Sequence, residues 1–180
     1  MHNWLLVAAV VACVIASIID LRTGQIPNWL TLGLFGAAPV VRGTAALIHH
    51  QRWGSAVLVG LLSLGSGVVA ALVPLLLSRR GGLGLGDVKL FAAIGAACGV
   101  FGALYAQAYA YVFAMVYALA LVARRGALGS TFENIKDILR KPGEPAAAPP
   151  DDARAALTEL KFAPAILCGM CVVAWVQWKP

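Results

Sequence analysis

The chain has 180 residues, of which 61% are hydrophobic and only 12% are charged, and its formal net charge is +6. A soluble domain of this size normally has about 25% charged and about 45–50% apolar residues. The chain therefore has too few polar residues to cover a water-facing surface. This excludes a soluble enzyme, a disordered chain and a small disulfide-stapled secreted domain. The sequence predicts an all-α, polytopic integral membrane protein.

Several apolar runs approach or exceed the roughly 17–25 residues that a helix needs to cross a bilayer. They extend from Trp4 to Ile19, from Trp29 to about Val41, and from Gly54 to Leu77. The run from Val88 to Ala123 is 36 residues long. One helix of that length would exceed a hydrocarbon core of ~30 Å. We therefore expect two spans there, hinged around Gly99–Gly102.

A polar segment, residues 124–161, separates these runs from a last apolar run, Phe162–Trp178. We expect the polar segment to be a cytosolic loop. The total is then about six transmembrane helices. The whole chain, residues 1–180, is expected to form a single membrane-embedded domain.

The basic residues predict the orientation of these spans, because Lys and Arg accumulate in cytosolic loops. With the N-terminus outside, eleven basic residues fall on the cytosolic side and three on the external side. The cytosolic set is Arg22, Arg79, Arg80, Lys89, Arg124, Arg125, Lys136, Arg140, Lys141, Arg154 and Lys161, and the external set is Arg42, Arg52 and Lys179. The positive charge thus reflects orientation in a plasma (inner) membrane, and no basic stripe indicates a nucleic-acid partner.

Two of the eight acidic residues stand apart from the rest. Six acidic residues lie in the predicted cytosolic segment, whereas Asp20 ends the first span and Asp87 opens the fourth. An Asp at the C-terminal end of a helix faces the unfavourable pole of the helix dipole, so a purely structural role for Asp20 is hard to justify. Both aspartates are expected at one membrane depth, on the cytosolic side.

Two carboxyls in close proximity cannot both ionise, so they share a proton. Such a dyad activates water with one carboxylate while the protonated partner polarises a peptide carbonyl. Gly84 and Gly86, just before Asp87, allow a substrate backbone to approach closely. The pattern indicates an aspartic protease, which needs neither a metal nor an organic cofactor.

The segment Gly84-Leu-Gly86-Asp87-Val-Lys89-Leu90 resembles the G-x-G-D-x-K-L motif of type IV prepilin peptidases. Asp20 followed by Ile26-Pro27-Asn28 is similar to the D…I-P-N element of the same family. The resemblance implies that Asp20 and Asp87 are the catalytic pair. It implies that Gly84, Gly86, Lys89, Pro27 and Asn28 are motif residues that support them.

The family removes the short basic leader peptide of prepilin-like precursors at the cytosolic membrane face. The resemblance therefore implies precursor proteins as substrates, with membrane lipid and possible pilus-assembly machinery as partners. Larger members carry an N-terminal zinc-bearing insertion associated with methylation, which has no counterpart before Asp20 here. The sequence thus resembles the short peptidases of tight-adherence (Flp-type) pili and of preflagellins, and methylation is not inferred.

The residues alone leave three alternative functions open. Presenilin-like intramembrane proteases share G-x-G-D, although their first aspartate follows a tyrosine and Asp20 follows Ile19. A small proton-coupled membrane carrier would use two aspartates as proton sites, nearer to mid-membrane. A non-catalytic pilus-assembly membrane protein would not need the aspartates. Cys168 and Cys171 have C-x-x-C spacing, but no second ligand pair lies nearby in the sequence, so no metal site is predicted.

Overall fold

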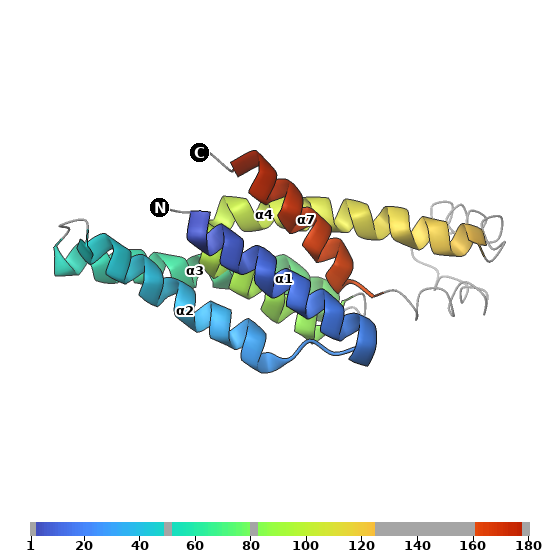
Figure 1. Ribbon diagram of the computed structural model, residues 1–180, viewed down its shortest axis with the longest axis horizontal. Helices are drawn as coiled ribbons and strands as arrows, with labels where there is room; N and C mark the ends of the chain where they lie inside the picture. The colour runs from blue at the N-terminus through green and yellow to red at the C-terminus, as the bar shows by residue number, and fades with distance from the viewer. Residues whose placement is uncertain (1–2, 49–51, 80–82, 125–160, 178–180) are drawn as a thin grey trace, which may run out of the picture. The chain divides into compact units, whose positions relative to one another are not determined.

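The computed structural model describes residues 3–48, 52–79, 83–124 and 161–177, and the regular structure in these ranges is entirely helical. The helices are α1 (Asn3–Thr23), α2 (Asn28–Ile48), α3 (Trp53–Arg79), α4 (Leu85–Arg124) and α7 (Ala163–Gln177) (Figure 1). The predicted all-α fold is confirmed.

The chain divides into two compact units. One comprises residues 1–111 and 161–180, and the other comprises residues 112–160. Of the second unit, the structure describes only residues 112–124, the last part of α4. The predicted cytosolic segment 124–161 lies almost wholly outside the described residues, and a single domain over 1–180 stays a prediction.

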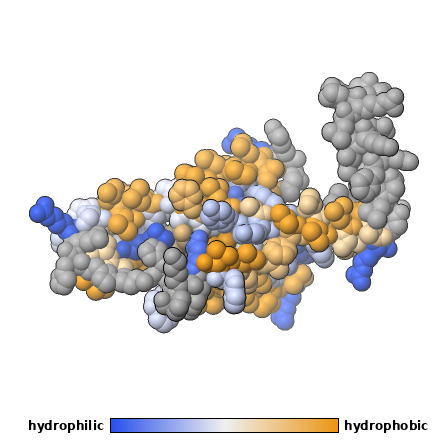
Figure 2. Space-filling model, turned by 90° about the horizontal axis from the view of Figure 1, so that it is seen from above, coloured by the Kyte–Doolittle hydropathy of each residue, from blue (hydrophilic) through white to orange (hydrophobic). Residues whose placement is uncertain are grey.

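Four described helices, α1 to α4, are long and apolar enough to cross a membrane, and α7 is a shorter apolar helix of 15 residues. Leu61, Leu62, Val68 and Leu72 of α3 are each more than half exposed. In Figure 2 hydrophobic residues cover much of the face shown. Such a surface is favourable in lipid and costly in water. The protein is therefore a polytopic membrane protein, for which a count of about six spans stays a prediction.

Helix α4 is interrupted at Gly99, within the predicted hinge. Gly99 has φ 80° and ψ 171°, a conformation that L residues with a side chain rarely adopt. The stretch before the break, residues 85–98, is ~21 Å long at 1.5 Å per residue. The break deprives the preceding carbonyls of their helical partners. The Ser63 hydroxyl donates to the Ala96 oxygen (2.8 Å), and the Arg42 guanidinium donates to the Ala97 oxygen (2.9 Å).

The bond from Arg42 bears on where the second helix ends. The apolar run reaches about Val41, and the sequence did not determine where the span ends; in the structure α2 continues past Arg42 to Ile48. Arg42 is half-buried and reaches a carbonyl of α4, so its charge is compatible with a helix interior. Helix α1 likewise extends beyond Ile19 to Thr23.

A second backbone hydrogen bond is missing in α3, because Pro74 has no N–H to donate to the Ala70 carbonyl oxygen. The buried side chain of Gln107, from α4, donates to that oxygen instead. Small residues allow this close approach of α3 and α4. A Cβ at Gly95 would lie 2.7 Å from the Ser66 carbonyl oxygen. Helix contacts through small residues and hydrogen bonds are typical of proteins in lipid.

Candidate active site

The two isolated aspartates lie at helix ends and are buried. Asp20 is in the last turn of α1, three residues before its end, and is 8% exposed. Asp87 is in the first turn of α4 and is 9% exposed. An acidic residue in a first turn is favoured by the helix dipole, whereas one in a last turn is not. The structure thus gives Asp20 a position that helix stability alone does not explain.

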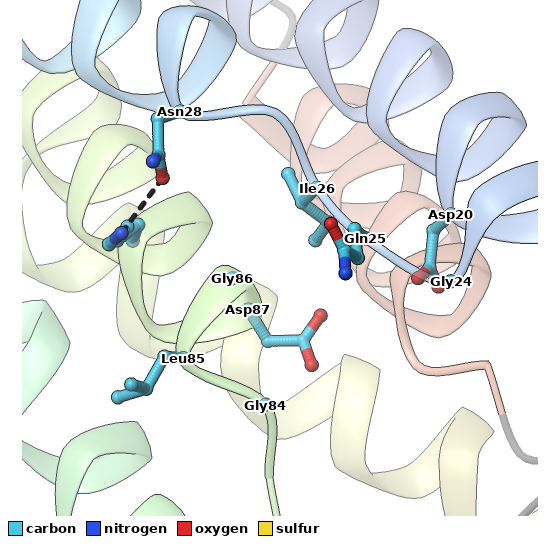
Figure 3. Close-up of a pocket in the computed structure, with 10 residues that line it drawn as sticks. Asp20, Gly24, Gln25, Ile26, Asn28, Gly84, Leu85, Gly86 and Asp87 are labelled. Carbon is cyan, nitrogen blue, oxygen red and sulfur yellow. Dashed lines mark hydrogen bonds between the residues drawn. The ribbon is translucent and has the colours of Figure 1, made fainter.

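Both carboxyls face one cavity of about 330 Å³ (Figure 3). Its lining comes from the end of α1, the α1–α2 connection and the start of α4. The lining residues are Asp20, Gly24, Gln25, Ile26, Asn28, Gly84, Leu85, Gly86, Asp87 and Lys89. The sequence places Asp20 and Asp87 67 positions apart, and the fold brings them to one site.

Gly24 turns the chain out of α1 and into the cavity wall. Its φ is +70°, and its N–H donates to the Asp20 carbonyl oxygen at 2.8 Å. A glycine in this left-handed conformation is a common helix C-terminal cap. The cap fixes the backbone of the turn that carries Asp20. It also directs Gln25 and Ile26 along the cavity (Figure 3).

The two glycines of the G-x-G-D motif make different close contacts. A Cβ at Gly86 would lie 3.2 Å from the Cβ of Ile26, so the absence of a side chain lets the α1–α2 connection pack on α4. A Cβ at Gly84 would lie 3.2 Å from Asp87 Oδ2. The Gly84 carbonyl also accepts from the N–H of Asp87 at 3.1 Å. Gly84 therefore leaves room for the Asp87 side chain, and Gly86 leaves room for Ile26 in the cavity wall.

Lys89 joins the two halves of the motif. Its ammonium donates to Asn28 Oδ1 at 2.8 Å, the contact drawn as a dashed line in Figure 3. Asn28 opens α2, directly after Pro27. The bond therefore ties the end of the α1–α2 connection to the first turns of α4. The sequence singled out Lys89 only as a residue of the G-x-G-D-x-K-L motif and predicted no partner for it.

Of the seven predicted site residues, the structure brings Asp20, Asp87 and four others to the cavity wall. The others are Gly84, Gly86, Lys89 and Asn28. Pro27 is not among the lining residues and precedes the first residue of α2. Sequence reasoning did not select Gly24, Gln25 and Leu85. A glycine just after a helix is a signal that would have found Gly24, whereas Gln25 and Leu85 carry none.

Among the described residues, no group of three or more His, Cys, Asp or Glu side chains is placed to hold a metal ion. The chemical groups of the cavity wall are two carboxyls, an amide–ammonium pair and the backbone of glycine-rich segments. Such a set is suited to proton transfer and to holding a peptide backbone.

The fold and the helices define a polytopic, all-helical membrane protein with two buried carboxyls at one cavity. The sequence pattern of the type IV leader peptidase family matches residues 7–119, which include both aspartates. The chain belongs to this family and is a peptidase. No curated protein and no solved structure matched the chain.

Proposed function

We propose that the protein is an aspartic endopeptidase that removes the short basic leader of prepilin-like precursors, such as Flp-type pilins, pseudopilins or flagellins. The observation that carries the proposal is that Asp20 and Asp87 line the same cavity, together with Gly84 and Gly86 of the G-x-G-D motif and Asn28 of the I-P-N element. Family membership supports the peptidase class. The two carboxyls are assigned as the acid and the base.

In the proposed reaction, the ionised carboxyl takes a proton from water, and the water oxygen attacks the scissile carbonyl carbon. The protonated carboxyl meanwhile donates to the carbonyl oxygen. A proton then passes to the amide nitrogen as the C–N bond breaks. The products are a carboxylate on the leader and a free amine on the mature protein. Because a helix is about 10–12 Å across with side chains and its carbonyls are already bonded, the scissile segment must unwind before it reaches the pair.

We place the cavity on the cytosolic side of the plasma membrane, with the N-terminus outside. Arg22 in the last turn of α1 and Arg79 in the last turn of α3 are basic. Lys89 lines the cavity, and Lys161 approaches it at Gly24. An accumulation of cations at the cavity end supports this orientation, because cytosolic loops carry the excess of Lys and Arg.

The proposal is tested by following the cleavage of a co-expressed prepilin-like precursor with Asp20→Asn and Asp87→Asn. Each substitution keeps the side-chain shape and removes the acid. We expect each to lower the cleavage rate by about 10²–10⁴-fold, the usual contribution of general acid–base catalysis. Asp151→Asn, from the polar segment, is the matched control and is expected to cleave like the wild type. All variants are compared at equal membrane levels.

Near-normal cleavage by either Asn variant would exclude the dyad. If the wild type cleaves no prepilin-like precursor, the carrier and assembly-protein alternatives return. A carrier is disfavoured because both aspartates lie in terminal helical turns, whereas proton sites of carriers lie near the bilayer midplane.

A further inference from the structure

An aromatic cluster lies next to the Asp87 side of the site. The rings of Phe91 and Tyr111, both on α4, have centroids 6.1 Å apart. Phe162, just before α7, lies 5.8 Å from the Tyr111 ring and 6.3 Å from the Phe91 ring. Tyr111 is therefore held between the start of α7 and the first part of α4.

Two contacts connect this cluster to the cavity. Phe91 follows Asp87 by four residues, so the two side chains share one face of α4. Lys161, the neighbour of Phe162, has its ammonium 2.9 Å from where a Cβ of Gly24 would lie, and Gly24 lines the cavity. Phe91 thus links the Tyr111 ring to the face of α4 that carries Asp87.

The Tyr111 hydroxyl is buried and has no hydrogen-bond partner among the described residues. Within the described residues, the buried side-chain polar atoms without a hydrogen-bond partner are Ser17 Oγ, Arg42 Nε and the Tyr111 hydroxyl. Leaving a buried polar atom unpaired costs about 1–3 kcal/mol. A phenylalanine at position 111 would keep the ring contacts and avoid that cost. Ser17 is three residues before Asp20 on α1, so one of the other unpaired groups lies one helical turn from an aspartate.

We propose that Tyr111 is a positioning residue for Asp87, acting through one water molecule between the hydroxyl and the carboxyl. The inference rests on the proposed function. A buried water needs two to four polar partners, and the hydroxyl and the carboxyl supply two. The hydroxyl donates to the water and the water donates to one Asp87 oxygen, which leaves the other oxygen directed to the cavity. Asp20, Lys89 and Lys161 are the other ionisable groups at this site.

The test compares Tyr111→Phe with the matched control Tyr105→Phe, which removes the hydroxyl of a 58% exposed tyrosine on the same helix. Cleavage of a prepilin-like peptide gives kcat and KM. We expect Tyr111→Phe to lower kcat by about tenfold, the equivalent of one hydrogen bond, with KM unchanged within about twofold. Tyr105→Phe is expected to match the wild type.

A second measurement needs no substrate. The infrared carboxyl band of Asp87 is identified by its loss in Asp87→Asn and is then compared in the two Phe variants. Loss of a hydrogen bond to the carboxyl shifts this band, so we expect a shift in Tyr111→Phe and none in Tyr105→Phe.

An unshifted band in Tyr111→Phe overturns the inference, even if kcat falls, because the hydroxyl then does not reach Asp87. An unchanged kcat also overturns it. If the wild type cleaves no prepilin-like substrate, the proposed function fails. In that case Tyr111 has no role in this cleavage reaction. The infrared comparison alone then decides whether the hydroxyl interacts with Asp87.

Discussion

Gly86 determines how closely the two halves of the motif pack. The glycine has no side chain on the surface that Ile26 covers, and an added Cβ would be only 3.2 Å from the Ile26 Cβ. Ile26 lies between Asp20 and Asn28 on the cavity wall. A side chain at position 86 would therefore push the α1–α2 connection away from α4. The distance between the two carboxyls depends on that contact.

We predict that Gly86→Val lowers kcat/KM for prepilin cleavage by about a hundredfold, because a misplacement of ~1 Å in a catalytic site has an effect of this size. The matched control is Gly54→Val. Gly54 is also the second residue of its helix, and a Cβ there would have no neighbour within 4 Å. Equal cleavage by the two variants would contradict the role given to Gly86.

The Lys89–Asn28 bond is the second link between the motif halves. We predict that Lys89→Met and Asn28→Ala each lower cleavage several-fold. The double variant should be no worse than the more damaging single variant, since both remove one bond. Cleavage rates of the four proteins in a double-mutant cycle check this. Strictly additive losses would show that the two side chains act independently.

At the scale of helices, side chains from neighbouring helices compensate for breaks in the backbone hydrogen bonding. Gln107 donates a hydrogen bond to the Ala70 carbonyl, which Pro74 leaves unpaired. Ser63 and Arg42 donate hydrogen bonds to carbonyls just before Gly99. In lipid no water replaces these bonds. The bonds therefore make the interruptions in α3 and α4 compatible with a membrane interior.

We predict that Gln107→Leu lowers the free energy of unfolding by about 1–3 kcal/mol, because the Ala70 carbonyl stays unpaired. In a Pro74→Ala background the helix supplies its own N–H to that carbonyl, so the same substitution should have a smaller effect. Thermal unfolding in detergent, measured for all four proteins, gives the coupling. If Gln107→Leu lowers the stability equally in the wild type and in Pro74→Ala, Gln107 does not compensate for the N–H that Pro74 lacks.

Local patterns predicted part of this arrangement. The glycine-rich stretch at 99–102 predicted the break in α4, and two lone aspartates in an apolar chain predicted a pair. Gln107 is a polar residue inside the apolar run Val88–Ala123, and the sequence does not predict its partner, because that partner is a carbonyl that only three-dimensional packing brings near. Tyr111 was missed because it is one of four tyrosines in the same apolar run, and nothing in the local sequence distinguishes it from the others. The continuation of α2 past Arg42 to Ile48 was not predicted, because a charged residue after an apolar run does not show whether the helix ends there.

At the scale of the whole molecule, the distribution of charge predicts which side of the membrane each connection faces. We expect alkaline phosphatase fused after His50 to be active, because the proposed orientation puts that connection outside. Green fluorescent protein fused after Gly82 is expected to fluoresce, because the proposed orientation puts that connection in the cytosol. The reciprocal fusions at each site serve as controls. The opposite pattern would place the cavity outside and contradict the proposed site of cleavage.

The division of the cavity wall between α1 and α4 also has a consequence for biosynthesis. A ribosome delivers the first helix and the connection after it well before residues 84–89 emerge. Under the proposed mechanism, the nascent chain carries one carboxyl without its partner during that interval and has no proteolytic activity. The capacity to cut begins only when the fourth helix inserts beside the first. Folding thus acts as the activation step, and no inhibitory propeptide is required.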